Sequence, residues 1–144
     1  MKLQQLSLFL ENRSGALRAP CDALAAAGID VLTMSLADST QFGVLRLVVR
    51  DPERALQVLE KAGMVAKVTE VVTVQVENKP GGLAAILKAI DEAGLGVEYM
   101  YDFGAACKGG QAAIIFRFDD PDTAVKALTA AGVRVLTREE MLGS

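Results

Sequence analysis

The stretch "LENRSGAL" (residues 10–17) is written a second time as "VENKPGGL" (residues 76–83). Each stretch follows an apolar run and precedes an alanine-rich one, and both share the pattern Glu-Asn-basic-x-Gly-x-Leu at a spacing of 66 positions. A packed core constrains apolar positions, so it gives no reason to repeat a polar loop. The repeat therefore predicts that the chain holds two copies of one structural unit.

The similarity between the two halves extends beyond this loop. At a shift of 66 positions Gly28 and Val31 recur as Gly94 and Val97. Further along the shift becomes 69, because three extra residues enter near residues 106–111, "ACKGGQ", which we interpret as a longer Gly-rich hairpin loop. Only two copies are present, which predicts a tandem pair rather than a solenoid.

Each copy has the same predicted order of elements. "LQQLSLFL" (residues 3–10) alternates as a half-buried strand does, and Asp51-Pro52 is a preferred helix start. We expect strands at residues 3–10, 30–37, 42–50 and 65–68 with helices at 16–27 and 52–62, and then strands at 71–76, 97–103, 112–118 and 133–136 with helices at 83–93 and 121–131. This order predicts an α+β chain of two tandem ferredoxin-like βαββαβ units, residues 1–69 and 70–144, each an antiparallel sheet with helices on one face.

The face of the first sheet opposite its helices is expected to be apolar. The residues assigned to it are Phe9, Leu32, Met34, Leu36, Val44 and Val48. A solvated sheet face is normally polar, so we expect another sheet or another chain to cover this one. The simplest such assembly is a homodimer.

Pro20 conflicts with a first helix that begins at residue 16. Inside a regular helix, proline removes a hydrogen bond and clashes with the preceding turn, at about 3 kcal/mol. Two outcomes are open: the helix begins later, with Pro20 in its first turn, or it is kinked.

The composition argues against several classes of protein. The chain has no histidine, which removes the commonest metal ligand and general base, and we expect no catalytic residues, no metal and no cofactor. A net charge of −3 argues against nucleic acid as the partner, and no apolar run approaches the roughly 20 residues of a membrane span. Cys21 and Cys107 lack a CxxC neighbour, so we expect free thiols and a cytoplasmic location.

The repeated loop joins a strand to a helix, where backbone N–H groups favour a carboxylate or phosphate. Gly15 and Gly81-Gly82 allow close approach of a ligand, and Asn12 and Asn78 can both donate and accept hydrogen bonds. Such a loop suits a zwitterion such as an amino acid. The alternative is an ordinary strand-to-helix turn without any ligand.

The segments "ENRSGAL…AAAGIDV" and "ENKPGGL…DEAGLGV" resemble the opening of the ACT domain, a regulatory module of ferredoxin-like fold that binds small molecules. The resemblance covers essentially the whole chain, and "SLADSTQFGVLRLVVRDPERA" and "VEYMYDF" resemble a subgroup of stand-alone tandem ACT proteins. It implies that an amino acid binds where ACT units meet, near the first loop and the second strand of each copy.

The resemblance also implies a set of ligand-binding residues. These are Asn12, Arg13, Ser14, Gly15, Ala16, Leu17, Asp38, Ser39 and Thr40 in the first copy, and Asn78, Lys79, Pro80, Gly81, Gly82, Leu83, Tyr99 and Tyr101 in the second. Ordinary structural explanations stand beside this set, because "ADST" is a good polar turn and tyrosines favour strands. Thr33 and Ser35 occupy the tyrosine positions in the first copy, so we expect the two sites to bind differently.

These expectations lead to a non-enzymatic sensor that binds an amino acid and signals to a regulated enzyme through its assembly state. The main alternative is a ligand-free ACT-fold module that only dimerises and contacts a partner protein. Enzymatic and RNA-binding functions are less favoured, since the sequence has no convergent acid-base pattern and no aromatic platform on its central strands.

Overall fold

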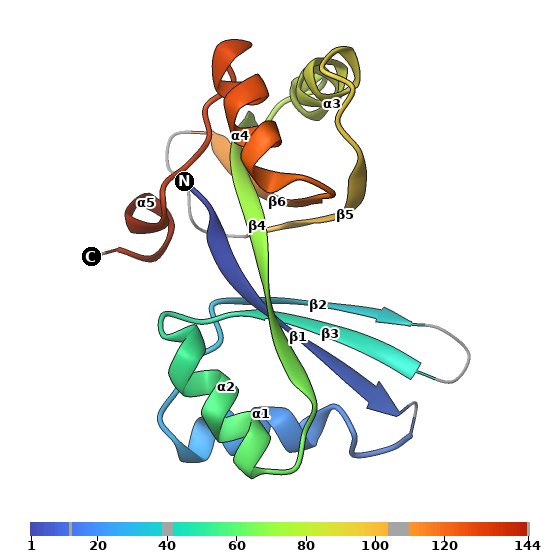
Figure 1. Ribbon diagram of the computed structural model, residues 1–144, viewed down its shortest axis with the longest axis vertical. Helices are drawn as coiled ribbons and strands as arrows, with labels where there is room; N and C mark the ends of the chain where they lie inside the picture. The colour runs from blue at the N-terminus through green and yellow to red at the C-terminus, as the bar shows by residue number, and fades with distance from the viewer. Residues whose placement is uncertain (12, 39–41, 104–109, 144) are drawn as a thin grey trace. The chain divides into compact units, whose positions relative to one another are not determined.

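The structure is a computed structural model that describes residues 1–11, 13–38, 42–103 and 110–143 (Figure 1). The chain divides into two compact units. Gln4–Thr69 form one, here called the N-terminal unit, while Glu70–Ser144 together with Met1–Leu3 form the other, the C-terminal unit.

The N-terminal unit is a sheet with two helices on one face (Figure 1). Its elements are β1 (Leu3–Glu11), α1 (Arg18–Ala26), β2 (Thr33–Asp38), β3 (Phe42–Val48), α2 (Pro52–Lys61) and the start of β4 (Ala66–Glu77). The strands follow the order β2-β3-β1-β4, and β3 pairs antiparallel with both β1 and β2. Helices α1 and α2 pack against each other on the sheet.

Leucines from alternate positions of the strands build the core of this unit. The buried residues are Leu6, Leu8, Leu10, Leu24, Leu45, Leu47, Val49, Ala55 and Leu59. Complete burial of one such leucine contributes about 1.5–3 kcal/mol. The strand predicted at residues 3–10 is thereby confirmed, with Leu6, Leu8 and Leu10 on its core face. It is not half-buried as predicted, because Gln5 and Ser7 on the other face are buried too.

Two of the residues predicted to lie on the open sheet face lie on the opposite face. Met34 pairs with Leu47 and Leu36 pairs with Leu45, and directly opposed residues of antiparallel strands point to the same face. Met34 and Leu36 therefore lie on the helix-covered face with the core leucines. They remain 47% and 51% exposed because β2 is the last strand of the sheet.

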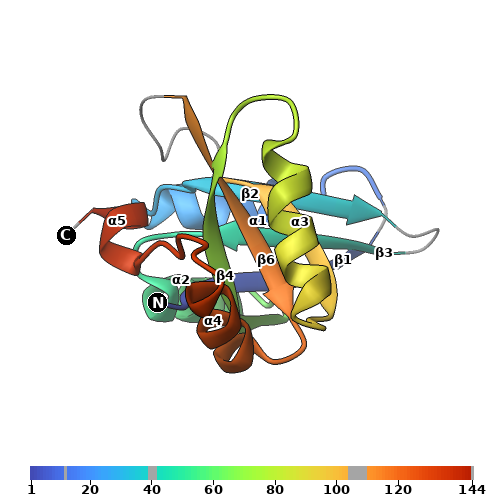
Figure 2. The same cartoon turned by 90° about the horizontal axis from the view of Figure 1, so that it is seen from above.

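The C-terminal unit has the same architecture with three well-formed strands. It contains the rest of β4, α3 (Gly82–Glu92), β5 (Val97–Asp102), β6 (Gln111–Phe118), α4 (Pro121–Ala130) and α5 (Arg138–Leu142). The strand order is β4-β6-β5, with antiparallel pairs. Figure 2 shows α3 and α4 on one face of this sheet, with β6 visible between them. The predicted α+β fold of two ferredoxin-like halves is confirmed.

Among the predicted strands, those around residues 65–76 and 133–136 differ most from the structure. The strands expected at residues 65–68 and 71–76 form one continuous strand, β4. The strand expected at 133–136 is reduced to a single bridge between Val74 and Val135. The pairing ends there because Thr137 starts a capping box with Glu140, which begins α5.

The remaining helix starts follow the expected chemistry. Asp51 and Asp120 each accept a backbone N–H bond at the start of a helix, and proline occupies the next position in both. Helix α1 begins at Arg18, which places Pro20 in its first turn, where the N–H groups have no partner within the helix. Of the two outcomes left open for Pro20, the later start is therefore correct. None of the described helices has the length and apolarity to cross a membrane.

Candidate functional site

The two copies of the repeated loop share one backbone feature. Gly15 and Gly81 have φ values of 87° and 86°, in the left-handed region that side chains disfavour. The repeated glycine is therefore required by the shape of the turn itself. Gly82 has a different role, because a Cβ atom there would lie 1.9 Å from the carbonyl oxygen of Glu77.

The expectation that the loops expose free backbone amides is wrong for five of their N–H groups. These groups donate to carbonyls of their own unit. The pairs are Arg13 to Glu11 (2.9 Å), Ala16 to Arg13 (3.3 Å), Asn78 to Gly110 (2.9 Å), Lys79 to Glu77 (2.9 Å) and Gly82 to Lys79 (3.0 Å). These five N–H groups are therefore not free for a ligand.

The repeated acid-basic pattern forms the same ion pair in both loops. Arg13 Nε lies 2.9 Å from Glu11 Oε2, and Lys79 Nζ lies 2.7 Å from Glu77 Oε2. The hydrogen bond that Lys79 donates to Glu77 raises the pKa of Lys79, which stays charged at neutral pH. Exposed pairs of this kind contribute little to stability, so the repeat of the pattern needs another reason.

A small pocket lies beside the first loop, here called the first-loop pocket. Its volume is about 220 Å³. It is lined by Leu10, Glu11, Arg13, Ala16, Leu17, Leu36 and Gly43. Apart from the Glu11–Arg13 ion pair, every lining residue is apolar or glycine.

A larger pocket lies at the matching place in the C-terminal unit, here called the second-loop pocket. Its volume is about 350 Å³. It is lined by Val76, Glu77, Asn78, Lys79, Leu83, Asp102, Gln111, Ala112 and Ile114. The shifts of 66 and 69 positions map six residues of the first-loop pocket onto this one, so the two cavities are equivalent sites of the repeat.

The structure distributes the predicted site residues unevenly. Arg13, Ala16 and Leu17 line the first-loop pocket, and Asn78, Lys79 and Leu83 line the second. Ser14 and Gly15 line neither pocket, although they lie in the same turn. Asn12, Ser39 and Thr40 lie outside the described residues, and of Asp38 only the backbone is described, paired with Gly43.

Tyr99 and Tyr101 lie on the opposite sheet face from the second-loop pocket. They pair with Arg117 and Ile115, whereas Met100 pairs with the buried Phe116 on the helix-covered face. The two rings stack on each other with centroids 6.5 Å apart. They do not line the pocket. The lining residue that β5 contributes is Asp102.

Asp102 and Gln111 are polar lining residues that sequence reasoning missed. The signal was available, because the shift of 66 positions aligns Asp102 with Leu36, and both line their pockets. The chemistry of Tyr99 and Tyr101 favours them as ligand contacts. The register of β5 with β6, which the sequence does not reveal, points both rings away from the pocket.

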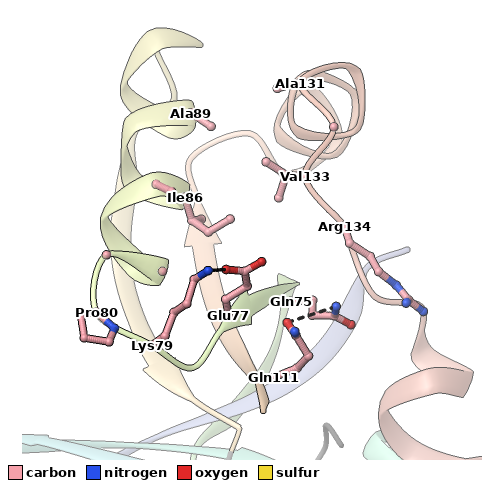
Figure 3. A pocket seen from close by; sticks show the side chains of 14 residues that line it. Gln75, Glu77, Lys79, Pro80, Ile86, Ala89, Gln111, Ala131, Val133 and Arg134 are labelled. Atoms are coloured by element: carbon pink, nitrogen blue, oxygen red, sulfur yellow. Dashed lines mark hydrogen bonds and ion pairs between the residues drawn. The ribbon is translucent and has the colours of Figure 1, made fainter. Parts of the chain in front are cut away.

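A third hollow lies behind the second loop, between α3 and α4 (Figure 3). Pro80, Gly81 and Gly82 border it at one end, and its volume is about 580 Å³. Figure 3 shows Gln75 and Gln111 hydrogen-bonded to each other at its floor, at 3.4 Å. In the N-terminal unit the corresponding helices α1 and α2 pack against each other.

Comparison with known proteins identifies the family of the chain. The sequence matches the ACT domain pair over residues 1–142. The chain belongs to the ACT domain pair family. The resemblance that the repeated loop carries is thereby confirmed. No curated protein matches this ACT domain pair.

Solved structures share the fold of this ACT domain pair. The crystal structure of protein BT0572 from Bacteroides thetaiotaomicron is 32% identical, covers 98% of this chain and 96% of its own, and has a TM-score of 0.88. The ligand-free regulatory subunit of aspartate kinase from Thermus thermophilus is 20% identical, with a TM-score of 0.62 and coverage of 89% and 91%. The regulatory subunit from Thermus flavus has the same identity and a TM-score of 0.58. At 20% identity the likeness concerns the fold alone.

Proposed function

We propose that this ACT domain pair is a non-enzymatic regulatory protein that binds a small amino acid and signals through its assembly state. The observation that carries the proposal is the second-loop pocket, where Asn78 and Lys79 offer donors for a carboxylate and Asp102 offers an acceptor for an ammonium group. Val76 and Ile114 add an apolar lining. A free amino acid has these three chemical parts.

The size of the pocket supports the same class of ligand. Its volume of about 350 Å³ lies at the lower end of the range of about 300–1,000 Å³ that holds small molecules. No group of three or more acidic or cysteine side chains that could bind a metal is found in the described parts of the chain. The volume of the pocket therefore supports the binding of a small molecule.

Signalling in this proposal depends on self-association in the cytoplasm. Phe9 and Phe42 are 54% and 52% exposed, and the register of β1 and β3 places them on the same sheet face. Exposed apolar residues that cluster in this way mark association surfaces. We propose that a second copy of the chain covers them and that an amino acid shifts the balance between two assembly states, which a regulated enzyme then reads.

Thermal unfolding with each of the twenty common amino acids tests the ligand. A ligand at a hundred times its Kd adds about 2.7 kcal/mol to the free energy of unfolding. For a chain of this size the Tm should then rise by roughly 5–15 °C. If no amino acid raises the Tm at millimolar concentration, the ligand proposal is wrong. Sedimentation with and without the best amino acid tests the assembly.

A ligand-free dimerisation module is the second candidate. The observation in its favour is that several loop N–H groups, among them those of Arg13, Asn78 and Lys79, already donate to carbonyls within the protein. In that case the chain dimerises in sedimentation experiments, the twenty amino acids leave its Tm and mass unchanged, and Asn78→Ala alters neither. An amino-acid-dependent mass would contradict this candidate.

A further inference from the structure

The two equivalent pockets differ in charge at one matched position. Leu36 on β2 pairs with Leu45, and Asp102 on β5 pairs with Ile114, which is the counterpart of Leu45 at a shift of 69. The backbone therefore offers both side chains to the same place. The N-terminal unit puts an isobutyl group there, and the C-terminal unit puts a carboxylate.

A second difference is coupled to the first. A Cβ atom on Gly43 would lie 3.3 Å from Leu36 Cδ1, a contact tighter than side chains normally accept. Leu36 thus leans over Gly43 and occupies part of the first-loop pocket. Ala112 replaces Gly43 in the second-loop pocket, where the shorter Asp102 replaces Leu36. The exchange leaves a cavity of about 350 Å³ in place of one of about 220 Å³.

The charges of the two pockets follow from these exchanges. In both pockets one acid and one base form an ion pair that leaves no net charge, Glu11 with Arg13 and Glu77 with Lys79. Asp102 places a further carboxylate in the lining of the second-loop pocket, and the first-loop pocket has no counterpart among its lining residues. A carboxylate accepts short, strong hydrogen bonds from an ammonium group, whereas a leucine leaves that group without a partner.

We propose that Asp102 is the specificity-determining residue of the chain: the second-loop pocket binds the ammonium group of an α-amino acid on Asp102, and the first-loop pocket rejects the same ligand because Leu36 stands there. The inference rests on the proposed function and adds to it the binding group, the copy that binds and a stoichiometry of one amino acid per chain. The carboxylate of the ligand then faces Asn78 and Lys79 at the loop.

Titration calorimetry of the full chain at neutral pH tests the role of the ammonium group. The probe is the amino acid with the largest thermal shift, compared with the 2-hydroxy acid of the same side chain, such as L-lactate for L-alanine. We expect one site per chain and at least a tenfold weaker binding of the hydroxy acid. Equal affinities, or two equal sites per chain, would overturn the inference.

Matched substitutions assign the site. Asp102→Asn keeps the shape and removes the charge, and should weaken the probe at least tenfold. Asp102→Leu with Ala112→Gly copies the first-loop pocket and should abolish binding. Leu36→Asp with Gly43→Ala copies the second-loop pocket and should raise the stoichiometry to two. Asp102 and Leu36 are exposed, so the Tm without ligand should change little and serves as the folding control.

The outcomes separate this inference from the proposed function. If an amino acid binds and Asp102→Asn binds it as tightly as the natural chain, only the role of Asp102 is wrong. If none of the twenty amino acids binds the natural chain, the proposed function is wrong and this inference falls with it.

Discussion

Single residues in the loops serve the backbone as much as any ligand. Gly82 was expected to let a ligand approach closely, but the atom that approaches it is the carbonyl oxygen of Glu77. The counterpart in the first copy is Ala16, which precedes α1, whereas Gly82 is the first residue of α3. The two copies therefore differ at this position both in the methyl group of Ala16 and in where the helix begins.

Gly82→Ala should destabilise the C-terminal unit. A Cβ atom 1.9 Å from the Glu77 oxygen forces the backbone apart, and overpacking of this kind costs about 1–3 kcal/mol. Denaturant titration measures the loss. Ala84→Ser, at an exposed position in the same helical turn, is the control and should stay within about 0.5 kcal/mol of the natural chain. Equal stability of both variants would mean that the loop relaxes freely.

Among the elements, α5 shows how short-range chemistry can end a strand and begin a helix. Thr137 and Glu140 exchange capping hydrogen bonds, and Met141 and Leu142 are buried. Glu140 also pairs with Arg134, which borders the hollow between α3 and α4. The polar C-terminal segment, for which the sequence predicted no element, therefore contains a helix with two buried side chains.

The pH dependence of stability should report on this helix. The backbone hydrogen bond from Thr137, followed by the bond from Arg134, lowers the pKa of Glu140 from its ordinary value of 4.5. A lowered pKa in the folded state gives a stabilisation that is present above pH 4.5 and lost as the pH falls through the folded value.

Glu140→Gln isolates this contribution because glutamine can keep the capping box without the charge. We expect the variant to have a lower Tm at neutral pH and the difference from the natural chain to shrink toward about pH 3. Thermal unfolding across that range measures it. A difference that is constant with pH would show that the charge of Glu140 contributes nothing.

At the scale of the whole molecule, two cores of similar composition are built from one repeated pattern. Leu24 of α1 and Ile90 of α3 are counterparts at a shift of 66 positions, and each is buried in the core of its own unit. Units of about 70 residues are marginal when folded alone. Disruption of one core should therefore destabilise its own unit more than the other.

Leu24→Ala and Ile90→Ala form a matched pair that tests this. Each removes a buried side chain and should cost its unit about 2–5 kcal/mol. In native-state hydrogen exchange we expect Leu24→Ala to reduce protection mainly within residues 4–69, and Ile90→Ala mainly within residues 70–144. An equal loss across both ranges in either variant would mean that the chain opens as one cooperative body.

Much of the candidate site followed from the repeat, and the rest needed the register. The spacing located both loops, the residues after them and the left-handed glycines, because a turn depends on neighbours in the chain. It did not locate Leu36 or Asp102, and it chose Tyr99 and Tyr101 instead. The reason is that alternation along a strand separates two faces without saying which one meets the loop.

The sequence by itself determined the family, the order of elements and the helix starts at Asp51 and Asp120, since these rest on local hydrogen bonds and on a pattern written twice. Only the tertiary structure decided which side chains share a pocket with the loops. That choice depends on the pairing of β2 with β3 and of β5 with β6, because a shift of one residue in either pair turns every side chain of the strand to the other face.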